Sequence, residues 1–258
     1  MLKKRIVGAV LVRDKIAVQS FSYNKYLPIG DPLVLIENLE RWGVDEIALV
    51  VMDRGNNGPD LELIEKISSR GLSTPLIYAG GIKKSENAIS AIRHGAERLI
   101  VDSVLFDNSG EVKEISYKIG SQALIASMPL IISDKTLKHY NYQTRQINEI
   151  SENILNMIRN KYFSEIIAID FKNEGRSSSY DDFIIDEITK FTDLSIIPFG
   201  GISSNNQIEN LLNYSNVSAV MIGNSLNYRE NAIFHIKNRL SNNSVRVHNL
   251  SKNENKKN

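Results

Sequence analysis

The sequence predicts a (β/α)8 barrel, a TIM barrel, built from two similar halves. Short runs rich in Ile, Val and Leu alternate eight times with amphipathic stretches along the 258 residues, which is the element order of a closed parallel sheet. The motif Gly-Gly-Ile follows such a run twice, at Gly80-Gly81-Ile82 and at Gly200-Gly201-Ile202, 120 positions apart. A half-length repeat of strand, glycine turn and helix predicts paired sites at the carboxyl ends of the strands.

The repeat extends beyond the glycine turns. Asp45-Glu46-Ile47 precedes one apolar run, and Ser164-Glu165-Ile166 precedes its counterpart in the second half. Likewise, Val101-Asp102-Ser103 is matched by Gly223-Asn224-Ser225. We therefore expect these segments to occupy equivalent places in the two half-barrels.

The expected strands are continuous apolar runs, as in strands that are covered on both faces. They span residues 5–12, 46–52, 75–79, 98–102, 123–128, 165–169, 195–199 and 219–222. Helices are expected near residues 32–42, 60–70, 85–94, 109–119, 145–161, 181–190, 204–214 and 228–240, with start signals at Asp31-Pro32, Ser85-Glu86 and Ser203-Ser204. A doubly wound open sheet is the alternative, but no Gly-x-Gly-x-x-Gly turn supports it.

The composition narrows the class of protein. With 42% hydrophobic residues, 24% charged residues and a net charge of +1, nothing indicates binding to nucleic acid or to a membrane surface. The absence of Cys excludes disulfides, thiolate metal sites and a Cys nucleophile, and the four His show no metal-binding spacing. We expect a cytoplasmic protein without a metal or cofactor, consisting of one barrel over residues 1–240 and a polar, flexible tail over residues 241–258.

The two glycine turns are candidate phosphate sites. Glycine lets backbone amides approach an anion, and amides at helix starts attract phosphate. The first group comprises Gly80, Gly81 and Ser103, and the second Gly200, Gly201, Asn224 and Ser225. The alternative is that these glycines only permit tight turns.

Several of these motifs together resemble one family over almost the whole chain. They are Met1-Leu2-Lys3-Lys4-Arg5-Ile6, Gly30-Asp31-Pro32, Gly80-Gly81-Ile82, Gly120-Ser121-Gln122, Tyr180-Asp181 and Gly200-Gly201. The family is that of the cyclase subunit of imidazole glycerol phosphate synthase. The resemblance implies a glutamine-hydrolysing partner on the amino-terminal face of the barrel and passage of ammonia through the barrel to a phosphorylated substrate. It also adds Gly175, in the pair Glu174-Gly175, to the phosphate-binding candidates.

The resemblance further implies a gate for ammonia at the floor of the barrel. Charged residues stand at the predicted starts of strands one, two, four and six: Arg5, Glu46, Arg98 and Glu165. In the family such residues form an alternating ring where ammonia enters. Two cations and two anions that converge there would need one another, since buried charge is costly unless it is paired. Four unrelated surface ion pairs are the alternative.

The departures from the family concern catalysis. At the positions of the two general acid/base aspartates, this chain has Leu11 and Pro129, neither of which can transfer a proton. Asp53 and Asp170 remain as candidate carboxylates near strand ends. Whether the chain is an enzyme is therefore left open.

Three functions follow from these observations. Leu11 and Asp53 match a side branch of the family, the glycosyl amidation-associated proteins of surface-polysaccharide loci, which accompany a glutaminase and a sugar amidotransferase. The leading hypothesis is accordingly a barrel that partners a glutaminase and channels ammonia for sugar amidation, with a phosphorylated or nucleotide-sugar ligand. The alternatives are an authentic cyclase of histidine biosynthesis and a non-catalytic phosphate-binding scaffold.

Overall fold

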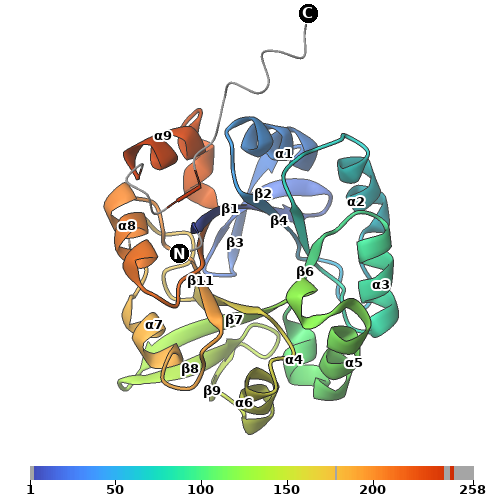
Figure 1. Cartoon of the computed structure of the whole chain (residues 1–258), viewed down its shortest axis with the longest axis vertical. Coiled ribbons are helices and arrows are strands. Elements are labelled where there is room, and N and C mark those ends of the chain that lie inside the picture. Colours follow the sequence, from blue (N-terminus) through green and yellow to red (C-terminus); the bar gives the residue numbers. More distant parts are fainter. Residues whose placement is uncertain (1–2, 178, 241–244, 247–258) are drawn as a thin grey trace, which may run out of the picture.

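A barrel of parallel strands lies at the centre of the protein, and helices surround it (Figure 1). The structure is a computed structural model that describes residues 3–177, 179–240 and 245–246. Among these residues, eight parallel strands follow one another in chain order: β1 (Arg5–Arg13), β4 (Glu46–Val51), β5 (Leu76–Ala79), β6 (Arg98–Val101), β7 (Leu124–Ser133), β10 (Glu165–Asp170), β11 (Ser195–Phe199) and β12 (Ala219–Ile222). β12 pairs with β1, and a bridge between Ile196 and Val217 closes the ring. The predicted (β/α)8 barrel is confirmed.

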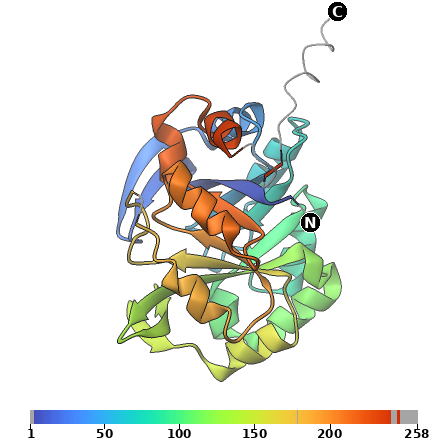
Figure 2. The same cartoon turned by 60° about the vertical axis from the view of Figure 1, so that its left-hand side comes forward.

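Two antiparallel hairpins extend the barrel beyond β1 and β7. The first comprises β2 (Ile16–Phe21) and β3 (Lys25–Gly30), and the second β8 (Thr136–Asn141) and β9 (Gln146–Glu149). Each begins with a two-residue turn, Asp14-Lys15 or Asp134-Lys135, whose residues all have positive φ, as in a type I′ turn. Both hairpins lie on the side of the barrel away from the amino terminus (Figure 2).

Helices cover the outside of the barrel. They are α1 (Pro32–Arg41), α2 (Leu61–Ser68), α3 (Ser85–Arg93), α4 (Ser103–Asp107), α5 (Ser109–Ile119), α6 (Glu152–Arg159), α7 (Phe183–Ile188), α8 (Asn205–Asn213) and α9 (Ala232–Arg239), with 3-10 turns η1 (Ser121–Ala123) and η2 (Asn224–Tyr228). The side chains of Asp31 and Ser204 cap α1 and α8, as predicted. Ser85 does not cap α3, because it is already the first helical residue. The prediction of a helix over residues 145–161 was wrong for its first part, because β9 occupies Gln146–Glu149 and α6 begins only at Glu152.

The alternation of side chains along β1 defines the inside of the barrel. Val7 and Ala9 belong to the apolar cluster in the barrel interior, whereas Ile6 and Val10 pack toward the helices. Successive strand residues point to opposite faces. Arg5 and Leu11 therefore face the interior too, one at each end of the barrel.

The glycine turns show that the two halves repeat in three dimensions. A Cβ atom on Gly80 would lie 2.4 Å from the carbonyl oxygen of Val51, and one on Gly200 would lie 2.8 Å from that of Asp170. Val51 and Asp170 are the last residues of β4 and β10, which are equivalent strands. Each turn thus packs against the end of the same strand in its own half, and glycine is required in both.

The predicted tail falls almost entirely outside the described residues. Within it, Val245 is buried and pairs with Lys4 beside β1. The amide of Arg246 also donates to the carbonyl oxygen of Lys4. The boundary between barrel and tail at residue 240 stays a prediction. Val245 and Arg246, which lie beyond this boundary, contact Lys4 at the edge of the barrel.

Candidate functional site

Four charged side chains meet at the amino-terminal end of the barrel. They are the first residues of their strands: Arg5 in β1, Glu46 in β4, Arg98 in β6 and Glu165 in β10. Nη1 of Arg5 donates to both carboxylate oxygens of Glu46 at 2.9 Å, and its Nη2 donates to Glu165. Arg98 donates to Glu46 at 3.4 Å, and its Nη2 lies 2.5 Å from Glu165. Each arginine contacts both glutamates, so the structure brings the four together in a closed charged ring.

The charged ring is largely withdrawn from solvent. The two glutamate side chains are 8% exposed, and those of Arg5 and Arg98 are 13% and 15% exposed. Burial alone would raise the pKa of Glu165, but the charges of both arginines and a hydrogen bond from Ser218 outweigh it, so its pKa lies below the usual value. The four buried charges therefore compensate one another within one cluster and do not form separate surface ion pairs.

At the other end of the barrel, the carboxyl ends of the strands surround a cavity of about 280 Å³, which we call the mouth cavity. Its lining includes the apolar side chains of Leu11, Val50 and Ile169. Tyr23 and Tyr142, from the two hairpins, also line it, and their rings stack at 6.1 Å between centroids. The apolar interior of the barrel separates the mouth cavity from the charged ring.

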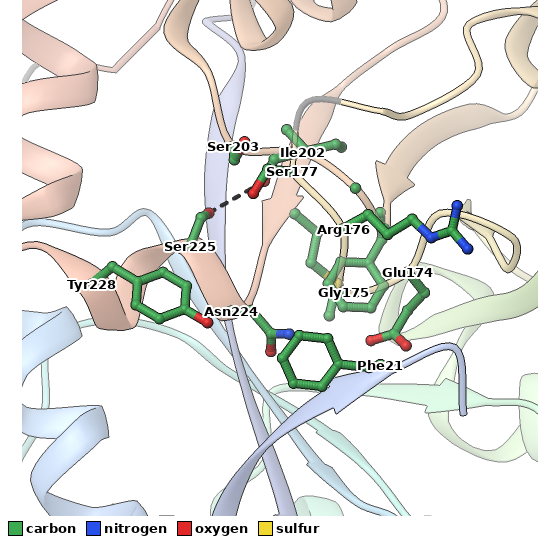
Figure 3. Close-up of a pocket in the computed structure, with 14 residues that line it drawn as sticks. Phe21, Glu174, Gly175, Arg176, Ser177, Ile202, Ser203, Asn224, Ser225 and Tyr228 are labelled. Carbon is green, nitrogen blue, oxygen red and sulfur yellow. Dashed lines mark hydrogen bonds between the residues drawn. The ribbon is translucent and has the colours of Figure 1, made fainter. Parts of the chain in front are cut away.

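A second pocket of about 300 Å³ lies beside the mouth cavity, in the second half of the barrel (Figure 3). Five predicted phosphate-binding residues line it: Gly175, Gly200, Gly201, Asn224 and Ser225. Ser177, Ser203 and Ser225 gather on one side of this pocket, and the guanidinium group of Arg176 points away from them (Figure 3). The hydroxyl of Ser225 donates to the carbonyl oxygen of Ile202 at 3.2 Å.

The corresponding residues of the first half lie elsewhere. Gly80, Gly81 and Ser103 line the mouth cavity, so the two predicted phosphate groups belong to different cavities. The first group also shares its cavity with the carboxyl group of Asp102. A negative charge opposes an anion at this place. Glu174 lines both cavities. Phosphate binding stays a prediction for both groups.

Comparison with known proteins identifies the family. A model of the histidine biosynthesis protein family matches residues 5–232. The chain belongs to this family. It is 25% identical over 252 residues to imidazole glycerol phosphate synthase subunit HisF of Staphylococcus carnosus, covering 96% of this chain and 99% of that one. It is 24% identical over 256 residues to the HisF subunit of Natranaerobius thermophilus, with the same coverage of both chains. The resemblance to the cyclase subunit is thereby confirmed.

For a member of the histidine biosynthesis family, the positions of Leu11 and Pro129 are the main departures. Leu11 pairs with Val50 in β4, and Pro129 pairs with Ile169 in β10. Both are buried at the carboxyl end of the barrel. The structure thus places an apolar side chain at each position where the resemblance implies a catalytic aspartate.

The two remaining candidate carboxylates do not line the mouth cavity. Asp53 is exposed and accepts a hydrogen bond from the amide of Asp14 at 2.7 Å. Asp170 is buried and accepts from Asn173 and from the amide of Asp181, at 2.7 Å and 2.8 Å. Both carboxylates shape loops, and the structure brings neither of them to the cavity.

Two carboxyl groups that sequence reasoning did not put forward for catalysis do line the mouth cavity. Burial raises the pKa of Glu174, whose carboxylate accepts from the hydroxyl of Ser20 at 3.1 Å and from the amide of Tyr23 at 3.3 Å. Burial, together with the nearby charge of Asp107, raises the pKa of Asp102 to about 7. The sequence does contain a sign that Asp102 differs from its counterpart. The equivalent position in the second half of the repeat is Asn224, which has an uncharged amide side chain.

Neither a membrane span nor a metal centre is found in the part of the chain that the structure describes. Its helices are too short or too polar to cross a bilayer. No group of three or more His, Asp or Glu side chains in those same ranges is arranged to hold a metal ion.

Proposed function

We propose that this chain is the barrel subunit of a glutamine-dependent amidotransferase. A glutaminase would dock on the face that carries the charged ring, and ammonia would pass through the barrel to an acceptor at the mouth cavity. The observation that carries the proposal is the alignment of three parts along one axis: a closed ring of charge, an apolar interior, and an open cavity.

The chemistry of each part supports this route. Ammonia is small and uncharged when it leaves a glutaminase, so an apolar interior is a tolerable path for it, whereas ions are disfavoured there. The charged ring closes the entrance in the unpartnered chain. Its longest contact, 3.4 Å between Arg98 and Glu46, is the natural place for it to open when a partner docks.

The acceptor chemistry is proposed to differ from that of the cyclase. Ring closure needs groups that donate and accept protons, and Leu11 and Pro129 supply none. Leu11 and Asp53 support membership of the glycosyl amidation-associated branch, in which the barrel feeds a sugar amidotransferase in surface-polysaccharide biosynthesis. A phosphorylated or nucleotide sugar is then the expected small molecule, and the cytoplasm its expected location.

Two other functions have specific support. The names of the relatives favour a cyclase subunit of histidine biosynthesis. The second pocket, with its glycines and serines, favours a phosphate-binding scaffold without ammonia traffic. Only the proposed route makes use of the charged ring.

The test is nitrogen coupling in a reaction reconstituted with the cognate glutaminase and sugar amidotransferase. Glu46→Gln removes one negative charge from the ring while keeping its size, so Arg98 and Arg5 share the single carboxylate of Glu165. The ratio of acceptor amidated to glutamine consumed should fall, because ammonia escapes to solvent. Glu97→Gln is the matched control: it changes an exposed glutamate beside Arg98 that is not in the ring. An unchanged ratio in folded Glu46→Gln would contradict the gate.

A further inference from the structure

The half-buried Asp102 is unusual because its carboxyl group makes no hydrogen bond or ion pair with the other residues that the structure describes. It follows β6 and stands at the N-cap of α4, yet its side chain makes no capping hydrogen bond. Its Oδ1 atom is buried and has no hydrogen-bond partner among the described residues. A buried carboxyl oxygen without a partner destabilises a protein, so a structural role does not account for it.

The equivalent residue in the other half has a structural role. The side-chain amide of Asn224 donates to the carbonyl oxygen of Ser20 at 2.7 Å, and its oxygen accepts from the amide of Ser20 at 3.2 Å. These bonds fasten the β2 strand to the second half of the barrel. Asp102 makes no such bond and instead lines the mouth cavity. The first half of the barrel therefore has a carboxyl oxygen, Oδ1 of Asp102, that lacks a hydrogen-bond partner among the described residues.

Two carboxyl groups, Asp102 and Glu174, and one cation are found among the described residues that line the mouth cavity. Tyr23 and Tyr142 face it from the hairpins, and Glu174 lines the same cavity. Asp107, on α4, lies close enough for its charge to raise the pKa of Asp102. The one cation among the described lining residues, Lys83, lies 3.5 Å from Asp107 and is engaged there. No positive side chain of the cavity is therefore left to neutralise Asp102.

We propose that the mouth cavity binds a small ligand through a cationic nitrogen group, an ammonium or an amidinium, which Asp102 receives, and that the same carboxylate keeps phosphate away from Gly81 and Ser103. An amidinium can donate two hydrogen bonds to one carboxylate, and such charge-assisted bonds are stronger than neutral ones. The stacked Tyr23 and Tyr142 supply ring faces, which attract cations. The inference goes beyond the ammonia route, because a ligand can bind at the mouth whether or not ammonia passes.

The test uses acetamidinium chloride as the probe and the full chain without a partner. Calorimetry should show saturable binding that strengthens between about pH 6 and about pH 8, because the raised pKa of Asp102 means that the receiving carboxylate ionises in this range. Asp102→Asn should weaken binding at pH 8 by at least about tenfold and remove its pH dependence. Inorganic phosphate should bind Asp102→Asn more tightly than it binds the wild type.

Asp14→Asn is the matched control, because it removes the same charge at an exposed position outside the cavity lining. It should bind acetamidinium within about twofold of the wild type. Absence of saturable binding to the wild type would overturn the proposal. Equal binding by Asp102→Asn, or a pH dependence that persists in it and so points to Glu174, would also overturn it. None of these measurements involves a glutaminase, so they can fail while the amidotransferase proposal stands.

Discussion

Leu11 and Pro129 occupy the same place in the two halves of the barrel. Leu11 pairs with Val50, four residues after Glu46, and Pro129 pairs with Ile169, four residues after Glu165. The register from the charged ring to the mouth is therefore identical in both halves. Both positions that the family resemblance assigns to acid/base chemistry hold apolar side chains, and four charged side chains form the ring at the opposite end.

The first prediction is that this chain cannot replace the cyclase of histidine biosynthesis. A general acid or base typically contributes about 10² to 10⁴ in rate, and the chain lacks a carboxyl group at both positions. A cyclase-deficient histidine auxotroph that expresses this chain should not grow without histidine. Growth on minimal medium, with the protein present in soluble form, would show that another group performs the chemistry.

The second prediction concerns the pair Lys237 and Asp45, which fastens α9 to the floor of the barrel. Their side chains are 5% and 6% exposed and lie 2.7 Å apart. Lys237→Met would leave a buried carboxylate unpaired, which costs about 3–5 kcal/mol of unfolding free energy. Urea denaturation of the wild type and of Lys237→Met measures this difference in unfolding free energy. Lys161→Met, which breaks the exposed pair with Asp193, is the control and should leave the midpoint unchanged. Equal effects of the two substitutions would refute the burial argument.

The third prediction compares two glycines with the same backbone conformation. Gly81 has φ of +67° and Gly71 has φ of +66°. A Cβ atom on Gly81 would lie 2.3 Å from the carbonyl oxygen of Gly58, whereas one on Gly71 would meet nothing within 4 Å. Gly71→Ala should lose only the conformational cost of about 1 kcal/mol. Gly81→Ala should lose about 1–3 kcal/mol more, because the Gly58 loop must move. Equal urea midpoints for Gly71→Ala and Gly81→Ala would show that the Gly58 loop moves without a cost in free energy.

The fourth prediction is that Asp102→Asn stabilises the protein, and does so more strongly at higher pH. The usual pKa of Asp is 3.8, and in the folded chain the pKa of Asp102 is about 7. Between these values the unfolded chain has released the proton while the folded chain retains it, so the wild type loses stability as the pH rises. The gain from Asp102→Asn should therefore increase from about pH 5 to about pH 8, reaching on the order of 1–4 kcal/mol. A stability gain from Asp102→Asn that does not change with pH would contradict the raised pKa of Asp102.

Much of the fold could be predicted from the sequence because its signals are local and doubled. The two glycine turns and the eight apolar runs define the barrel before any coordinates are known. The hairpins could not be predicted in this way. Their type I′ turns use Asp14-Lys15 and Asp134-Lys135, and Lys is an uncommon residue at a position with positive φ. The sequence does not distinguish strand β9 from the start of a helix, because its residues continue the polar pattern of α6.

The repeat predicted the glycine turns that line the two cavities, and the family resemblance supplied the charged ring. The residues of the charged ring could be named because they stand at strand starts, but their mutual contacts depend on the curvature of the whole sheet. Asp102 was visible in the sequence as the counterpart of Asn224. That its Oδ1 lacks a partner is a tertiary property, since it depends on which side chains the hairpins bring over the mouth.

The measurement that tests the central claim most directly is the rate of glutamine hydrolysis by the cognate glutaminase, with and without this chain. If the face that carries Arg5 and Glu165 is a docking face coupled to the ring, adding the chain should raise the rate by about 5- to 150-fold, the usual range for coupling between two sites. The increase should saturate at one chain per glutaminase. An unchanged rate, with no complex detected by sedimentation at the same concentrations, would contradict the account.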